Sequence, residues 1–140
     1  MSVLNTTLLR DAIAEAITST WAVKIINGQA ILHQQIPYAN LRLDNVEMEP
    51  LSICDVAQRY QWEITYVGKF TSNEVIEDLK VARANELIPE LMSSTTFATY
   101  GMNPRIASVE FEESDDPQEP FYAVTIMFEF EVHEQRFVTV

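Results

Sequence analysis

The sequence predicts a single α+β domain spanning residues 1–140, in which two helices pack on one face of a mainly antiparallel sheet. Three observations lead to this prediction. Apolar residues recur at three- and four-residue steps in two segments and alternate with polar residues in several others. These segments follow the order helix, three or four strands, helix and final hairpin. A chain of 140 residues without an internal repeat or a linker also fits one domain with one core.

The first helix is expected to begin at Thr6 or Thr7, because a threonine hydroxyl can cap the unpaired N–H groups of the first turn. Its apolar residues share one face, which must pack on the sheet: Leu9, Ala12, Ile13, Ala16 and Ile17. The dipeptide Asn27-Gly28 then predicts a turn, since it favours positive φ at both central positions. A short hairpin is expected there, between the apolar runs 22–26 and 30–32.

The middle of the chain predicts two extended segments. The first opens with Ile36-Pro37-Tyr38, continues through Leu41 and Leu43 by alternation, and is interrupted at Pro50. The second is the clearest strand, and one of its faces is apolar: Tyr60, Trp62, Ile64 and Tyr66. Its other face is polar: Arg59, Gln61, Glu63 and Thr65. We expect the apolar face in the core and the polar face in water or against a partner.

A second helix is expected after Thr71 or Ser72, because residues 71–74 have the form of a capping box. Pro89 predicts a kink or a restart at Ile88, since proline lacks an N–H and disfavours helical geometry in the preceding residue. The chain then closes with a hairpin. Its strands are expected over 106–112 and 122–132, joined by the acidic connection 113–120.

Composition excludes several classes of protein. The chain is 47% hydrophobic with only 3 glycines and 6 prolines, which excludes collagen-like and low-complexity chains. Cys54 is the only cysteine, so an intrachain disulfide is excluded and a reducing compartment is indicated. No signal peptide and no apolar run of membrane-spanning length is found, so we expect a cytoplasmic protein that does not enter a membrane. The net charge of −12 disfavours binding to phosphate backbones.

No residue pattern typical of an enzyme is found, and we expect no catalytic residue, cofactor or metal. Cys54 has no basic neighbour to lower its pKa, so it is interpreted as a small apolar residue. His33 and His133 lie in no metal-ligand spacing. The three glycines are too scattered to hold a phosphate: Gly28, Gly68 and Gly101. The acidic stretch 110–119 lacks the ligand pattern of a calcium loop and is interpreted as a solvated hairpin tip.

The acidity is concentrated at the C-terminal end. Residues 106–140 contain nine acidic residues and one basic residue, Arg136, a net charge of −8, whereas residues 1–105 contain twelve against eight, a net charge of −4. Three explanations remain open. The charge can serve solubility, it can mimic DNA as in acidic inhibitors of nucleic-acid enzymes, or it can line a ring through which DNA passes without sticking.

Taken together, the pattern resembles the tail terminator and head–tail joining (neck) proteins of long-tailed bacteriophages over nearly the whole chain. The segments that carry the resemblance are the helix LLRDAIAEAI (8–17), the proline-led strand IPYANLRL (36–43), the alternating strand YQWEITYV (60–67), the helix through IPELM (88–92) and the closing strand 122–132. They are patterns of form rather than a catalytic fingerprint. Segments 48–55 and 27–28 have no diagnostic match, so terminator and other neck components remain alternatives.

The resemblance implies a structural virion protein of the tail or neck, assembled in the host cytoplasm, that binds no cofactor and is not an enzyme. Such a protein forms a homo-oligomeric ring, a hexamer, that ends polymerisation of the tail-tube protein. Its other face meets a head-completion or connector protein, and DNA crosses its acidic lumen without specific binding. The alternatives are an acidic DNA-mimic inhibitor of a nucleic-acid enzyme, and a small α+β ligand-binding or enzyme domain with a polar-lined pocket.

Two sets of residues are the candidate sites. A sheet with both helices on one face leaves the other face for a neighbour, and a heterologous contact that closes makes a ring. We therefore expect the polar face of the clear strand at a subunit or tube contact: Arg59, Gln61, Glu63 and Thr65. We expect the acidic loop to face the lumen through Asp115, Asp116 and Glu119.

Overall fold

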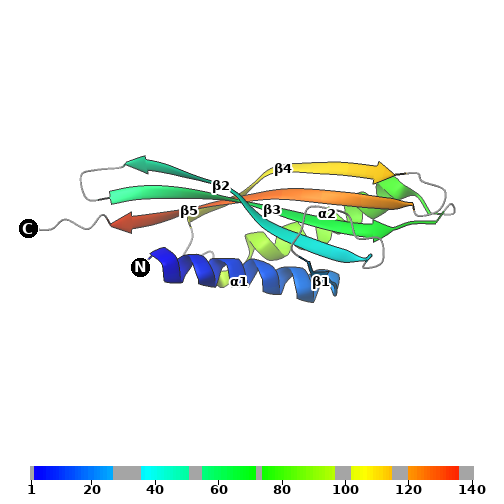
Figure 1. The fold of residues 1–140 in the computed structure, drawn as a ribbon, viewed down its shortest axis with the longest axis horizontal. Coiled ribbons are helices and arrows are strands. Elements are labelled where there is room, and N and C mark those ends of the chain that lie inside the picture. Colours follow the sequence, from blue (N-terminus) through cyan, green and yellow to red (C-terminus); the bar gives the residue numbers. More distant parts are fainter. Residues whose placement is uncertain are drawn as a thin grey trace, which may run out of the picture.

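The computed structural model describes residues 2–26, 36–50, 55–71, 74–96, 102–114 and 120–135. The elements are, in order, α1 (Ser2–Trp21), β1 (Lys24–Ile25), β2 (Tyr38–Pro50), β3 (Asp55–Lys69), α2 (Ile76–Met92), β4 (Met102–Ser114) and β5 (Phe121–Gln135). The strands form one sheet in the order β1-β2-β3-β5-β4, antiparallel except for the β1–β2 pair. Both helices lie on the same face of this long, twisted sheet (Figure 1). The predicted α+β fold is confirmed.

The core lies between the sheet and the two helices. The alternation predicted for β3 is confirmed, since Tyr60, Trp62, Ile64 and Tyr66 are all buried. β5 continues this apolar face, with Ile126 opposite Ile64 in the register. The rings of Tyr60 and Phe130 stack with their centroids 5.6 Å apart. The helices fill the space beneath the strands with side chains at helical spacing: Leu9, Ile13 and Ile17 from α1, and Ala84, Leu87 and Leu91 from α2.

The first helix begins earlier than expected. α1 starts at Ser2 rather than at Thr6 or Thr7. Residues 2–5 contain no proline or glycine, and adding a turn to an existing helix is easier than nucleating one. Thr6 and Thr7 therefore lie inside the helix and do not mark its start.

The second helix begins later than expected and does not stop at its proline. The backbone N–H of Thr71 donates to Oε1 of Glu74 (2.8 Å), but this pairing closes a separate turn, and α2 begins at Ile76. The helix continues without a break through Pro89 to Met92, so the expected restart at Ile88 does not occur and the kink stays a prediction. Proline removes one internal hydrogen bond of the helix, and the buried side chain of Leu91 holds the last turn on the core.

The strands at the two ends of the sheet differ in how well they were predicted. The expected turn at Asn27-Gly28 and the strand 30–32 lie outside the described residues. The segment before that turn forms β1, which pairs with β2 in parallel, Lys24 lying opposite Tyr38. Parallel strands need a connection longer than a tight turn. The final hairpin is confirmed, and its strands are longer than expected: β4 begins at Met102 and β5 ends at Gln135.

Both helices and the sheet meet around Arg83 of α2. Its carbonyl accepts a hydrogen bond from the indole Nε1 of Trp21 (3.1 Å), and its Nε donates to the hydroxyl of Tyr122 (3.2 Å). Its guanidinium lies 5.1 Å from the ring centre of Tyr66, which is also 5.1 Å from the ring of Trp21. Burial, reinforced by Tyr122, raises the pKa of Tyr66 to about 12, so this phenol is neutral at physiological pH.

Gly68 is the position where this packing leaves least space. A Cβ atom added there would lie 2.6 Å from Cε1 of Tyr66 and 2.8 Å from Cζ of Tyr122. Overpacking of this kind costs about 1–3 kcal/mol. We therefore expect Gly68→Ala to lower the free energy of unfolding by about that amount, measured by urea denaturation. Ser108→Ala, at an exposed position of β4, is the control. Equal stability of the two variants would contradict the packing assigned to Gly68.

Candidate functional site

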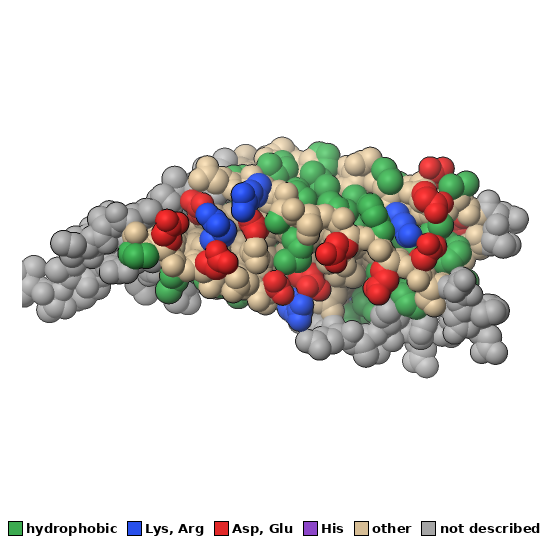
Figure 2. Space-filling model, turned by 90° about the horizontal axis from the view of Figure 1, so that it is seen from above, with side chains coloured by type: hydrophobic (Ala, Val, Ile, Leu, Met, Phe, Trp, Pro, Cys, Tyr) green, Lys and Arg blue, Asp and Glu red, His purple; other side chains and the backbone are tan. Residues whose placement is uncertain are grey.

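The face of the sheet that points away from the helices is called the outer face here. No described helix covers it (Figure 1). It carries acidic, basic and apolar side chains intermixed, rather than one large patch of a single kind (Figure 2). The four polar residues predicted at a contact all belong to this face, because they alternate along β3 with the buried core residues: Arg59, Gln61, Glu63 and Thr65.

Each of these four side chains bonds to the residue opposite it on a neighbouring strand. Glu63 Oε2 lies 2.7 Å from Nη2 of Arg42 on β2, and Nη2 of Arg59 lies 3.3 Å from Oε1 of Glu131 on β5. Gln61 donates to Glu129 on β5, and the hydroxyl of Thr65 lies 3.2 Å from that of Thr125, also on β5. Such cross-strand pairs contribute roughly 0.2–1 kcal/mol each. The outer face is therefore a polar surface whose charges are largely matched within the sheet.

Glu129 is the most buried charge of the outer face, with only 3% of the residue exposed. Its carboxylate accepts hydrogen bonds from Gln61 on β3 and from Nε of Arg105 on β4. Burial by itself would raise the pKa of Glu129, but these hydrogen bonds and the charges of Arg105 and Arg59 outweigh it and lower the pKa below its ordinary value. The ionised carboxylate thus ties together the three strands β3, β5 and β4.

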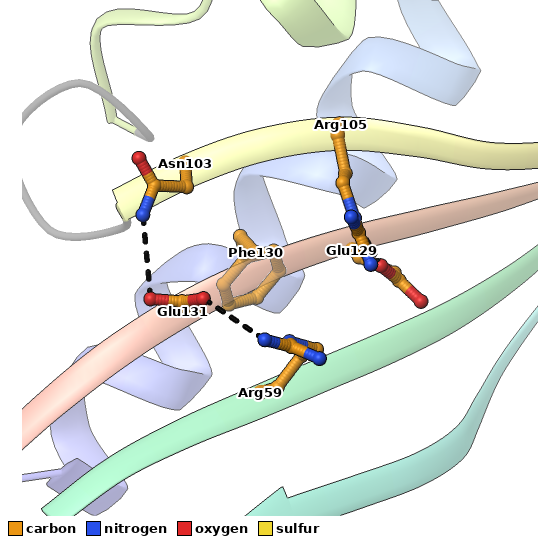
Figure 3. Close-up of a pocket in the computed structure, with 6 residues that line it drawn as sticks. All are labelled: Arg59, Asn103, Arg105, Glu129, Phe130 and Glu131. Carbon is orange, nitrogen blue, oxygen red and sulfur yellow. Dashed lines mark hydrogen bonds and ion pairs between the residues drawn. The ribbon is translucent and has the colours of Figure 1, made fainter.

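A shallow pocket of about 250 Å³ lies beside this carboxylate. Figure 3 shows its six lining residues, which come from β3, β4 and β5: Arg59, Asn103, Arg105, Glu129, Phe130 and Glu131. Asn103 has a φ of 51°, next to an irregularity in the β4–β5 register, and its Nδ2 donates to Oε2 of Glu131 (3.3 Å). A second pocket of about 240 Å³ adjoins it and shares Arg59 and Glu131.

The chemistry of these pockets is that of polar recognition. Each guanidinium in them is matched by a carboxylate, so they offer no net positive cradle for a phosphate. Within the described ranges, no group of three or more metal-binding side chains occurs. What the pockets can do is exchange hydrogen bonds with a polar partner surface.

One end of the outer face is apolar and closed. Tyr38, Val67 and Ala123 point to the outer face at the end where β2 begins, yet each is buried. Three partly buried side chains pack against them: Ile26, Ile36 and Phe121. The part of the outer face that remains accessible to a partner is therefore the polar middle and the opposite end.

Several residues of this surface were not singled out from the sequence. They are the partners of the β3 row and the lining of the pocket: Arg42, Asn103, Arg105, Glu129 and Glu131. The alternation along β5 puts Glu129 and Glu131 on its polar face, but no local pattern reveals which arginines they meet. The two glutamates belong to the acidic final hairpin, and the structure pairs both with arginines.

The other predicted residues are placed as follows. The acidic loop residues Asp115, Asp116 and Glu119 lie outside the described residues, as do Cys54 and His33. His133 belongs to β5, but its side chain is not described. Neither described helix combines the length and the apolar character needed to cross a membrane.

No protein-family model matches the chain, and no curated protein sequence is similar to it.

The buried carboxylate yields a test by pH. Because its folded pKa lies below the value of the unfolded chain, near 4.5, ionised Glu129 stabilises the fold fully above pH 4.5 and progressively less as the pH falls through the folded pKa. We expect Glu129→Gln to lower the free energy of unfolding at pH 7 by about 1.5–3 kcal/mol, the range for hydrogen bonds to a charged group. The difference from the wild type should shrink on acidification towards pH 3.

Urea denaturation at a series of pH values measures this difference. Glu110→Gln removes a carboxylate from an exposed position of β4 and is the matched control, with an expected change within about 0.5 kcal/mol. A Glu129→Gln effect that stays constant from pH 7 to pH 3 would rule out the ionised carboxylate as its source.

Proposed function

We propose that this chain is a structural virion protein that forms a closed ring, ends polymerisation of a bacteriophage tail tube and joins the tail to the head. The observation that carries the proposal is the outer face, a sheet surface left uncovered by both helices and bounded by two edge strands. A subunit of a ring needs such surfaces on two sides, because a heterologous contact uses a different patch on each partner. The order of elements adds support, since it follows the family pattern.

The charge distribution supports the passage of DNA. The outer-face carboxylates on β5 are matched by arginines, while Glu110 and Glu112 of β4 are exposed and lead toward the acidic connection at 115–119. A negative wall releases no counterions from DNA and therefore provides no binding site that would hold it. In the proposed ring this acidic end of β4 faces the lumen.

The two alternatives gain less support from the described residues. An inhibitor that mimics DNA needs carboxylates that remain available to a basic enzyme, whereas Glu63, Glu129 and Glu131 are each paired with an arginine of this chain. A small-molecule site usually encloses about 300–1,000 Å³, and the two polar pockets of the outer face are smaller and shallow.

The ring can be tested by native mass spectrometry and sedimentation velocity. The isolated protein, or its mixture with the tail-tube protein encoded nearest to its gene, is expected to form a closed oligomer, and a hexamer in particular. Adding it to growing tubes should stop their elongation in electron micrographs. A monomer at all concentrations both with and without the tube protein would overturn the proposal, as would a gene neighbourhood without capsid and tail genes.

Arg59 provides a sharper test of the contact. Arg59→Glu alone places two carboxylates opposite each other, so it weakens the sheet as well as the contact. The double variant Arg59→Glu/Glu131→Arg restores the pair across the strands but reverses its orientation. We expect the double variant to recover part of the stability that Arg59→Glu loses, because Glu47 on β2 still lies opposite position 59. We expect it to assemble, with itself or with the tube protein, at least tenfold more weakly.

Arg10→Glu makes on α1 the same charge change as the single variant Arg59→Glu and is the control for that variant. Wild-type assembly by the double variant would exclude Arg59 from the subunit and tube contacts.

A further inference from the structure

The sheet has two long edges. β1 pairs with β2 only at Tyr38 and Ala39, and in the described part of the chain no strand pairs with the same side of β2 from Leu41 to Pro50. At the opposite side of the sheet, β4 is the last strand along its whole length. The backbone N–H and C=O groups of an edge strand are a template for pairing with another chain, and proteins usually shorten or block such edges.

Both edges also expose apolar side chains on the core face of the sheet. On β2 the exposed fractions are 41% for Leu43, 37% for Val46 and 66% for Met48. Their opposite residues on β3 are Trp62, Tyr60 and Gln58, which point to the core. On β4, Phe111 is 46% exposed and lies opposite the buried Val124. The core face therefore continues to both edges of the sheet and is left partly uncovered there.

On both edge strands, the outer-face charges change from basic to acidic along the direction of the chain. Each of the two strands carries an arginine near its start and glutamates towards its end. On β2 these residues are Arg42, Glu47 and Glu49, and on β4 they are Arg105, Glu110 and Glu112. Antiparallel alignment of the two strands brings each basic start to the other strand's acidic end.

The direction of the strands allows this alignment between copies. β2 runs antiparallel to β4, because three antiparallel steps separate them in the sheet (Figure 1). A second copy placed beside the first in the same orientation therefore presents its β2 antiparallel to the first copy's β4. We propose that β4 of one subunit pairs with β2 of the next, so that the sheet continues from copy to copy.

One register satisfies the apolar and the charged residues together. With Phe111 opposite Leu43, the core-facing pairs are Phe111–Leu43, Val109–Val46 and Ile106–Met48, and the outer-face pairs include Glu112–Arg42 and Arg105–Glu49. Core-facing and outer-face pairs keep alternating along this register because both strands have a register shift, β2 between Leu43 and Asn45 and β4 between Ile106 and Ser108. Each strand thus contributes one extra residue to the same stretch.

This register also displaces each subunit along the strand direction relative to its neighbour. In its own sheet Phe111 lies level with Ala39, through Val124 and Tyr66. Its partner in the next copy is Leu43, four residues further along β2. A sheet that closes on itself requires its strands to be tilted and staggered. The inference rests on the proposed function, because the ring is the assembly in which such a head-to-tail contact closes.

Pairing of like edges is the competing arrangement. Two β2 strands, or two β4 strands, also match their charges when antiparallel. Either arrangement gives a two-fold dimer and leaves the other long edge of each subunit uncovered. Head-to-tail pairing covers both edges in every subunit, and this is why we favour it.

Disulfide trapping tests the contact and its register. In a Cys54→Ser background, Val46→Cys and Val109→Cys place thiols on directly opposed residues of the proposed pair, within the distance that a disulfide spans. The double variant is expected to give, on a non-reducing gel after oxidation, a ladder of covalent oligomers up to the size of the ring. A mixture of the two single variants should stop at a cross-linked dimer. The double variant Val46→Cys/Val81→Cys, with its second thiol on an exposed position of α2, is the control and should give no ladder.

Every outcome of the trapping decides the inference. Dimers from Val46→Cys alone or from Val109→Cys alone indicate pairing of like edges and overturn it. A double variant that forms no ladder, while the wild type is a ring by native mass, overturns the edge contact but leaves the proposed function standing. A wild type that remains monomeric with and without tube protein overturns the proposed function as well.

A blocking variant checks the same contact without oxidation. Phe111→Lys places a charge on the core face of the β4 edge, which is a common means of preventing edge pairing. We expect it to shift the protein from ring to monomer at concentrations where the wild type is assembled. Val81→Lys, at 49% exposure nearly equal to that of Phe111, is the matched control and should leave the ring intact. Loss of assembly in both variants, or in neither, contradicts the inference.

Discussion

The structure depends on the pairing of β3 with β5. These two strands run antiparallel over 15 residues without a register shift, from the Asp55–Gln135 pair to the Lys69–Phe121 pair. An uninterrupted register keeps every second side chain on the same face. The alignment of these two strands therefore creates both the apolar core face, which packs on the helices, and the polar outer face. β2 and β4 then attach on either side, and irregularities in their registers interrupt only these outer pairs.

The two faces created by this pairing have different physical roles. On the core face, stacked aromatic and branched side chains bury apolar area against α1 and α2. On the outer face, cross-strand pairs neutralise charges that would otherwise repel or attract unselectively, and buried Glu129 joins three strands. A surface of matched charge pairs contributes more to the specificity of binding a partner than to the affinity. The apolar area available for association lies instead at the sheet edges, which suits the edges to contacts between subunits and leaves the polar outer face for a polar partner such as the tube protein.

The sequence was most informative where a pattern is long and local. The alternation of residues 60–66 and 122–132 predicted two buried strand faces, and both are confirmed. Helix ends were predicted less well, because capping residues such as Thr6, Thr7 and Thr71 mark possible starts while packing and propagation choose among them. Pro89 predicted a kink or a restart at Ile88. The restart does not occur, since the helix runs on to Met92 and Leu91 of its last turn is buried in the core.

By itself, the sequence determined the fold class, the order of elements, the faces of the strongest strands and the row Arg59, Gln61, Glu63 and Thr65. Only the tertiary structure decided which strands are neighbours, and therefore which charges are matched. Arg59 and Glu131 are 72 residues apart, and no local pattern specifies that β5 inserts between β3 and β4. Periodicity reports the direction of a side chain relative to its own strand, whereas sheet order and edges arise from long-range pairing.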